Sequence, residues 1–136
     1  MLLGVGLAAC LGGGAPAPLA PDAWIQVRPG RQCEFTPAVR DAIREEQRAR
    51  LETLGVRPRA LHVAPSLDAL PGACQPEGGV RGLAARAADA GQQDVTELLS
   101  MMACAACGCP EPWFVCLRAE VPDEDDLAPL GFLRLR

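Results

Sequence analysis

Seven cysteines in a chain of 136 residues constrain this protein more than any other feature of its sequence. Four of them lie close together in the segment MMACAACGCPEPWFVC, residues 101–116. In a reducing compartment such a group indicates metal ligands or reactive thiols, whereas in an oxidising compartment it indicates disulfide bonds. The compartment therefore has to be inferred first, and the N-terminal residues bear on it.

The N-terminus has the pattern of an export signal. Residues 2–9 form an apolar run that is too short to span a bilayer as a helix. The run ends in Leu7-Ala8-Ala9-Cys10, which resembles the lipobox of bacterial lipoproteins, although no Lys or Arg precedes it. The resemblance covers only about the first 20 residues. It implies cleavage before Cys10, lipidation of the Cys10 thiol (diacylglycerol, with palmitate as a typical acyl chain) and attachment to a membrane.

The residues after the lipobox agree with this interpretation. Residues 10–22 contain three consecutive glycines and three prolines, which predicts a tether between the signal segment, residues 1–9, and a single domain, residues 23–136. Leu11 rather than Asp follows Cys10, which among Gram-negative lipoproteins implies the outer membrane. We therefore expect an exported protein, anchored at the outer membrane or cell surface, whose partners are the membrane and an envelope protein.

The composition excludes one broad class of partner. Hydrophobic residues make up 49% of the chain, which is enough for one packed core, and the net charge is −4. A nucleic-acid-binding surface normally carries a basic excess, so this balance argues against one. All 13 basic residues are Arg, and Lys, Asn and Tyr are absent, which is typical of a GC-rich genome. The arginine content therefore does not indicate phosphate recognition.

The hydrophobic pattern predicts an α+β domain, a two-layer sandwich of about four short strands and two main helices held by disulfides. The helix before the second strand begins at Thr36-Pro37, because Thr caps a helix and Pro suits its first position, and it runs to about Leu54. Alternating or continuous apolar runs bounded by Pro and Gly predict the strands at residues 22–29, 59–64, 113–121 and 131–136.

Two further helical segments are expected in the second half of the chain. An Ala-rich helix over residues 80–90 is weakened by Gly82, and residues 65–79 before it resemble a loop. A firmer helix starts at the capping-box-like Asp94-Val-Thr-Glu97, and its apolar face continues to Met102 and Ala106. Residues 123–126 are expected to form a solvated acidic turn, and Trp24, Trp113 and Phe114 are assigned to the core.

Cysteine parity supports export. If Cys10 carries lipid, an even number remains that can pair completely: Cys33, Cys74, Cys104, Cys107, Cys109 and Cys116. Six cysteines allow 15 pairings. Our preferred pair is Cys33–Cys74, which joins the segment before the first helix to the long loop. Closing a span of about 40 residues stabilises a domain by roughly 4 kcal/mol in the chain-entropy model.

Two alternatives remain open for the other cysteines. Cys104, Cys107, Cys109 and Cys116 could hold zinc or copper tetrahedrally, although a second CxxC and a nearby His are missing. Cys104 and Cys107 could also form a redox-active pair. We expect them at the C-terminal end of a helix, where the dipole disfavours a thiolate, and this counts against catalytic exchange.

No residue is assigned a catalytic or cofactor-binding role. His62 is the only histidine, and it lies in a strand on the face opposite Leu61 and Val63, with no motif that would place a triad partner beside it. We therefore expect a non-enzymatic role, either binding a partner or contributing to the structure of the cell envelope. A cysteine-cluster metal protein and a thiol-redox enzyme are the alternative functions.

Overall fold

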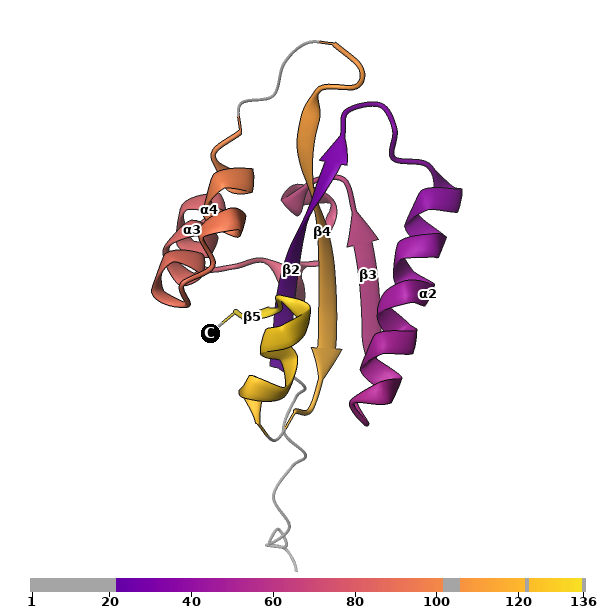
Figure 1. The fold of residues 1–136 in the computed structure, drawn as a ribbon, viewed down its shortest axis with the longest axis vertical. Helices are drawn as coiled ribbons and strands as arrows, with labels where there is room; N and C mark the ends of the chain where they lie inside the picture. The colour runs from indigo at the N-terminus through magenta and orange to yellow at the C-terminus, as the bar shows by residue number, and fades with distance from the viewer. Residues whose placement is uncertain (1–21, 102–105, 122, 136) are drawn as a thin grey trace, which may run out of the picture.

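A four-stranded antiparallel sheet forms the centre of the domain in the computed structural model, with the order β3-β4-β2-β5 (Figure 1). Two long strands, β2 (Asp22–Arg31) and β4 (Pro110–Ala119), pair along their whole length. The structure describes three stretches of the chain, residues 22–101, 106–121 and 123–135. Residues 1–21, which include the predicted signal and Cys10, lie outside them.

The two edge strands are short. β3 (Ala60–Ala64) pairs with β4 on the side away from β2, and β5 (Leu133–Arg134) pairs with β2. Each of the four strands overlaps a strand predicted from the sequence. β5 is the shortest match, because it covers only part of residues 131–136. The predicted α+β class and the number of strands are thus confirmed.

The helix α2 (Pro37–Thr53) confirms the clearest local prediction. The Thr36 hydroxyl accepts a hydrogen bond from the Val39 backbone N–H at 3.1 Å, and Pro37 occupies the first helical position. Its buried stripe is Ile43, Gln47 and Leu51, at a spacing of four residues.

Helices cover both faces of the sheet, which gives three layers rather than the predicted two. Figure 1 shows α2 on one side of the strands and α3 (Gly79–Asp89) with α4 (Gln93–Leu99) on the other. Side chains of β4 alternate between the two cores: Val115 and Leu117 pack with α2, whereas Phe114 and Cys116 pack with α3 and α4. A strand that is buried on both faces reads as a continuous apolar run.

The start and end of α4 differ from the prediction. The helix begins at Gln93, its N-cap Gln92 makes no side-chain capping bond, and Asp94 lies within the first turn, so the predicted capping box is wrong. The helix ends at Leu99, where the Ser100 hydroxyl donates to the Glu97 carbonyl at 2.8 Å. Ala106 is exposed in a bend, and Met102 lies outside the described residues, so the predicted helical continuation is not seen.

Three short 3-10 helices complete the domain. η1 (Leu67–Ala69) and η2 (Gly72–Cys74) lie within the predicted loop of residues 65–79. The Gln75 side chain joins the two, because its Nε2 donates to the Leu67 carbonyl at 2.7 Å and to the Leu70 carbonyl at 3.0 Å. η3 (Glu124–Leu130) begins at the predicted acidic turn, where the Asp123 carboxylate accepts from the Asp125 N–H. Within the described stretches, the helices are too short or too polar to cross a bilayer.

Candidate functional site

Two disulfide bonds link distant parts of the chain, Cys33–Cys107 and Cys74–Cys116. The predicted pair Cys33–Cys74 is therefore wrong. Cys33 lies in the turn after β2, beside the segment that leads into β4, whereas Cys74 lies on η2 and faces the middle of β4. The sequence distance between two cysteines carries no information on which of them the sheet brings together.

The two bonds lie in opposite environments. Cys74 and Cys116 are both 0% exposed and belong to the core beneath α3 and α4. Cys33 and Cys107 are both exposed, and Cys33 adopts a positive φ of 67° in its turn. Thiol–disulfide exchange requires a thiolate to reach a sulfur atom, so access decides which bond reacts first.

We expect a mild water-soluble reductant to open Cys33–Cys107 at least tenfold faster than Cys74–Cys116 under native conditions. The measurement is alkylation at timed intervals followed by peptide mapping, which reports each cysteine separately. In a denaturant the two bonds should be reduced at similar rates, which provides the control. Equal native rates would show that the Cys74–Cys116 sulfurs are as accessible as the exposed pair.

Cys109 is disulfide-bonded as well, to a cysteine outside the described residues. Three of the four ligands in the metal alternative, Cys107, Cys109 and Cys116, are therefore oxidised and offer no thiolate. The described residues bring no three His, Cys, Asp or Glu side chains together in a cluster suited to a metal ion. Cys104 lies outside the described residues.

The redox alternative requires a Cys104–Cys107 pair, but Cys107 is bonded to Cys33. Cys107 also lies in a turn rather than on the predicted helix end. His62 is half-buried opposite Cys116 on β3, and its side chain makes no hydrogen bond or ion pair with residues 22–101, 106–121 and 123–135. The described residues therefore assemble neither of the two catalytic arrangements that the sequence analysis considered.

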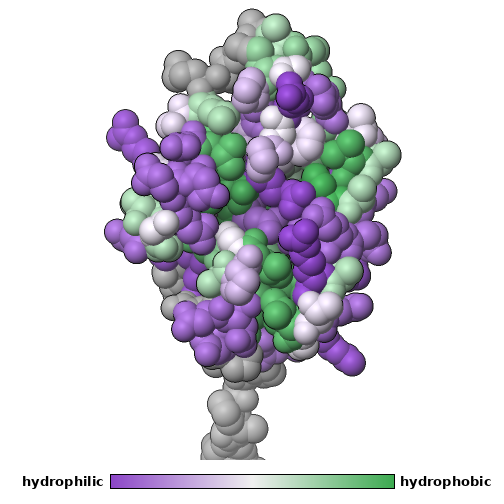
Figure 2. All heavy atoms as spheres, in the orientation of Figure 1, coloured by the Kyte–Doolittle hydropathy of each residue, from purple (hydrophilic) through white to green (hydrophobic). Residues whose placement is uncertain are grey.

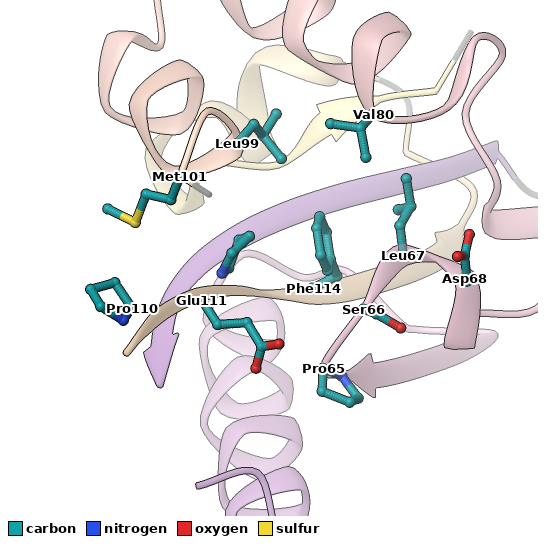
Figure 3. Close-up of a pocket in the computed structure, with 11 residues that line it drawn as sticks. Pro65, Ser66, Leu67, Asp68, Val80, Leu99, Met101, Pro110, Glu111 and Phe114 are labelled. Atoms are coloured by element: carbon teal, nitrogen blue, oxygen red, sulfur yellow. The ribbon is translucent and has the colours of Figure 1, made fainter. Parts of the chain in front are cut away.

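One of the hollows on the described surface is a cleft lined mainly by apolar side chains. It has a volume of about 290 Å³ and lies between the end of α4, the start of α3, the η1 segment and the first residues of β4. Figure 3 shows Phe114 and Leu67 on one side of this cleft, with Val80 and Leu99 opposite them. The cleft lining is completed by Pro65, Ser66, Asp68, Met101, Pro110, Glu111 and Pro112.

Exposed apolar side chains gather at this cleft. Among the described residues only three large hydrophobic side chains are exposed: Val80 at 45%, Met101 at 42% and Leu54 at 41%. Val80 and Met101 both line the cleft, whereas Leu54 ends α2 on the other face of the sheet. In the view of Figure 2, hydrophilic side chains separate the apolar groups from one another. Clustered exposed apolar side chains mark interaction sites more often than scattered ones do.

The polar groups of the cleft are acceptors. Its charged side chains are Asp68 and Glu111, and no described lining residue is basic. The Asp68 side chain makes no hydrogen bond or ion pair with the described residues, and the Glu111 carboxylate accepts only a long bond, 3.4 Å, from Trp113 Nε1. An apolar surface with two available carboxylates favours a ligand that is apolar and positively charged.

A second hollow is lined by Asp22, Arg86 and Arg134. Its arginines are already engaged: Arg134 pairs with Asp22 and stacks on the Trp24 ring at 5.2 Å, and Arg86 donates to the Arg134 carbonyl at 3.1 Å. The apolar cleft is therefore the better candidate for a ligand site.

This cleft was not predicted from the sequence, in which Pro65 marks only the start of the predicted loop and Val80 only the start of a predicted helix. The cleft arises because β3 and β4 are antiparallel neighbours, which brings the residues after β3 beside the residues that begin β4. The chain matches no protein-family model, no curated protein and no solved structure.

Proposed function

We propose that this protein is a small exported binding domain, anchored to a membrane surface of the cell envelope by a lipid on Cys10. The observation that carries the proposal is that every described cysteine is disulfide-bonded. Disulfides form and persist in oxidising compartments outside the cytoplasm. The apolar cleft supports a binding role over an enzymatic or purely structural one.

Pairing arithmetic supports the assignment of Cys10. Cys109 needs one partner, and the chain offers Cys10 or Cys104. Cys109 faces Gln32 at the Arg31 end of the β2–β4 pair, about 30 Å from Asp22 at about 3.4 Å per residue. Eleven residues lie between Cys10 and Asp22, and the steps that join them reach about 40 Å when fully extended, so a bond to Cys10 would use most of that reach, whereas Cys104 is close to Cys109 in the sequence. We therefore propose Cys104–Cys109, which leaves Cys10 for lipid.

The geometry also suits an anchored binding domain. The tether would join the domain at Asp22, which lies opposite Ala119, while the cleft includes Pro110 and Pro112 at the other end of the same strand pair. Figure 1 shows the start of β2 and the start of β4 at opposite ends of this strand pair. A domain attached in this way presents its cleft away from the membrane.

Radiolabelled palmitate tests the anchor. We expect a bacterial host that expresses the full-length chain to incorporate the label and to retain the protein in the membrane fraction. Cys10→Ser should reduce both to background, because it removes the acylated thiol. Cys104→Ser is the matched control: it removes a thiol outside the lipobox and should keep the label. Labelling that survives Cys10→Ser would refute the anchor.

A further inference from the structure

We infer that the cleft binds an extended peptide segment in which apolar side chains alternate with arginine or lysine. The inference rests on the proposed binding role and names the chemistry of the ligand. It is drawn from the lining of the cleft, the charges at its margin and the edge of β4 that no described strand covers.

The apolar part of the site is built by side chains from separate elements. Leu67 and Phe114 form one wall, and Val80 and Leu99 face them (Figure 3). Met101, at 42% exposed, extends this surface beyond the end of α4. Burying exposed apolar surface supplies the non-directional part of binding.

The backbone of β4 supplies a directional part. Antiparallel strands alternate bonded and non-bonded positions, and Gln32 N–H donates to the Cys109 carbonyl at 2.8 Å. By this alternation Glu111 and Trp113 are also bonded positions facing β2. Pro110 and Pro112, which lie between them, direct their carbonyls to the other side of β4.

No described strand reaches those two carbonyls. β3 lies on that side of β4 but ends at Ala64, opposite Phe114, and Pro65 then leads the chain away. Because proline has no N–H, this stretch of edge offers acceptors without donors. Pro110 and Pro112 are two residues apart, about 6.8 Å along a strand, which is the repeat of the N–H groups on one edge of an extended peptide.

The acidic side chains at the margin of the cleft determine which residues of the peptide are favoured between its apolar ones. The carboxylate of Asp68 lies beside Leu67 at one end of the cleft, and the Glu111 side chain leaves β4 on the side opposite Phe114 (Figure 3). In an extended peptide alternate side chains point to opposite faces, so apolar residues can enter the cleft while their neighbours meet the carboxylates. Among the described lining residues the charged ones are acidic, so the margin attracts a cationic peptide and repels an acidic one.

Three labelled peptides of equal length test the inference: leucine alternating with arginine, with glutamine and with glutamate. The full-length protein is reconstituted in vesicles of neutral phosphatidylcholine, and protein-free vesicles are the blank. Fluorescence anisotropy should show that the arginine peptide binds about fivefold or more tightly than the glutamine peptide, with the advantage lost at high salt, and that the glutamate peptide does not bind. Equal binding of the arginine and glutamine peptides would overturn the inferred charge selectivity.

Matched variants locate the site. Val80→Ser with Met101→Ser should weaken binding of the arginine peptide about tenfold, while Leu54→Ser, which alters the exposed hydrophobic residue on the other face, should leave it unchanged. Asp68→Asn with Glu111→Gln should weaken binding about fivefold. The control pair is Glu52→Gln with Glu120→Gln, which changes the net charge equally.

Each outcome of this experiment decides the inference. Binding that ignores the cleft variants, or capture of a fluorescent fatty acid in place of the peptides, would overturn it. A protein that is labelled at Cys10 but binds no peptide would leave the anchor standing and remove the peptide site. A protein that takes up no palmitate label but binds the arginine peptide at the cleft would refute the anchor and support the peptide site.

Discussion

Replacing Cys74 and Cys116 together by alanine is expected to lower the free energy of unfolding by about 4 kcal/mol. The bond closes a chain segment with a sequence separation of 42, and the chain-entropy model assigns about that value to such a loop. Both sulfur atoms are also fully buried, so their removal costs packing in addition. Domains of this size are stable by about 5–15 kcal/mol, so this loss removes a large part of the total.

Urea unfolding followed by tryptophan fluorescence measures this loss. Each single replacement, Cys74→Ala or Cys116→Ala, should cost nearly as much as the double replacement, because either one breaks the bond. Two single losses that add up to the loss in the double variant would show that the sulfurs contribute through packing alone.

The same replacement should also weaken peptide binding. Cys74 ties η2 to the centre of β4, and Gln75 ties η2 to η1, which carries Leu67 into the cleft wall. Without the bond this wall loses its covalent connection to the sheet. The buried disulfide therefore belongs to the support of the cleft as well as to the core.

Gly30→Ala is expected to lower the free energy of unfolding by about 2–3 kcal/mol. The Trp113 indole lies directly over Gly30, so an added Cβ would overlap the ring at Cδ2 and Cε2 and would come within 2.6 Å of Cγ. The ring has little room to move, because Trp113 is only 8% exposed and its edge packs against Phe35 at a centroid distance of 5.3 Å.

Thermal unfolding and near-ultraviolet circular dichroism check this prediction together. Gly30→Ala should lower the melting temperature and alter the tryptophan signal. Gly72→Ala is the matched control, because its Cβ would meet nothing within 4 Å and the change should be close to neutral. Wild-type stability in Gly30→Ala would mean that the indole is not held over the glycine in solution.

The helices and strands that are determined by residues close together in the sequence could be predicted. Thr36 and Pro37 define the start of α2 within the sequence itself, and the apolar run from Trp113 marks β4. That run also held a signal that the prediction missed. Every residue from Trp113 to Leu117 is buried, which requires cover on both faces of the sheet and hence three layers.

Features that depend on distant contacts were not predictable. The pairing of Cys33 with Cys107 follows from the turn after β2 lying beside the residues before β4. Gly82 was interpreted as a weakness in α3, yet a Cβ there would overlap the Glu77 carbonyl oxygen and lie 2.9 Å from its carbon. Gly82 lowers the helix propensity of α3, but the Glu77 backbone leaves no room for a larger residue at this position. This requirement is visible only in the folded structure.

The two bonds interleave along the chain: Cys33 and Cys74 both precede their partners, and Cys74 lies between Cys33 and Cys107. A polypeptide that crosses a membrane from its N-terminus exposes Cys33 and Cys74 to oxidant before either partner has emerged. Oxidation in order of emergence would trap a non-native crosslink, and exchange between disulfides takes minutes to hours without a catalyst. On the proposed export route, efficient maturation therefore calls for a disulfide isomerase, or for oxidation delayed until β4 has joined the sheet.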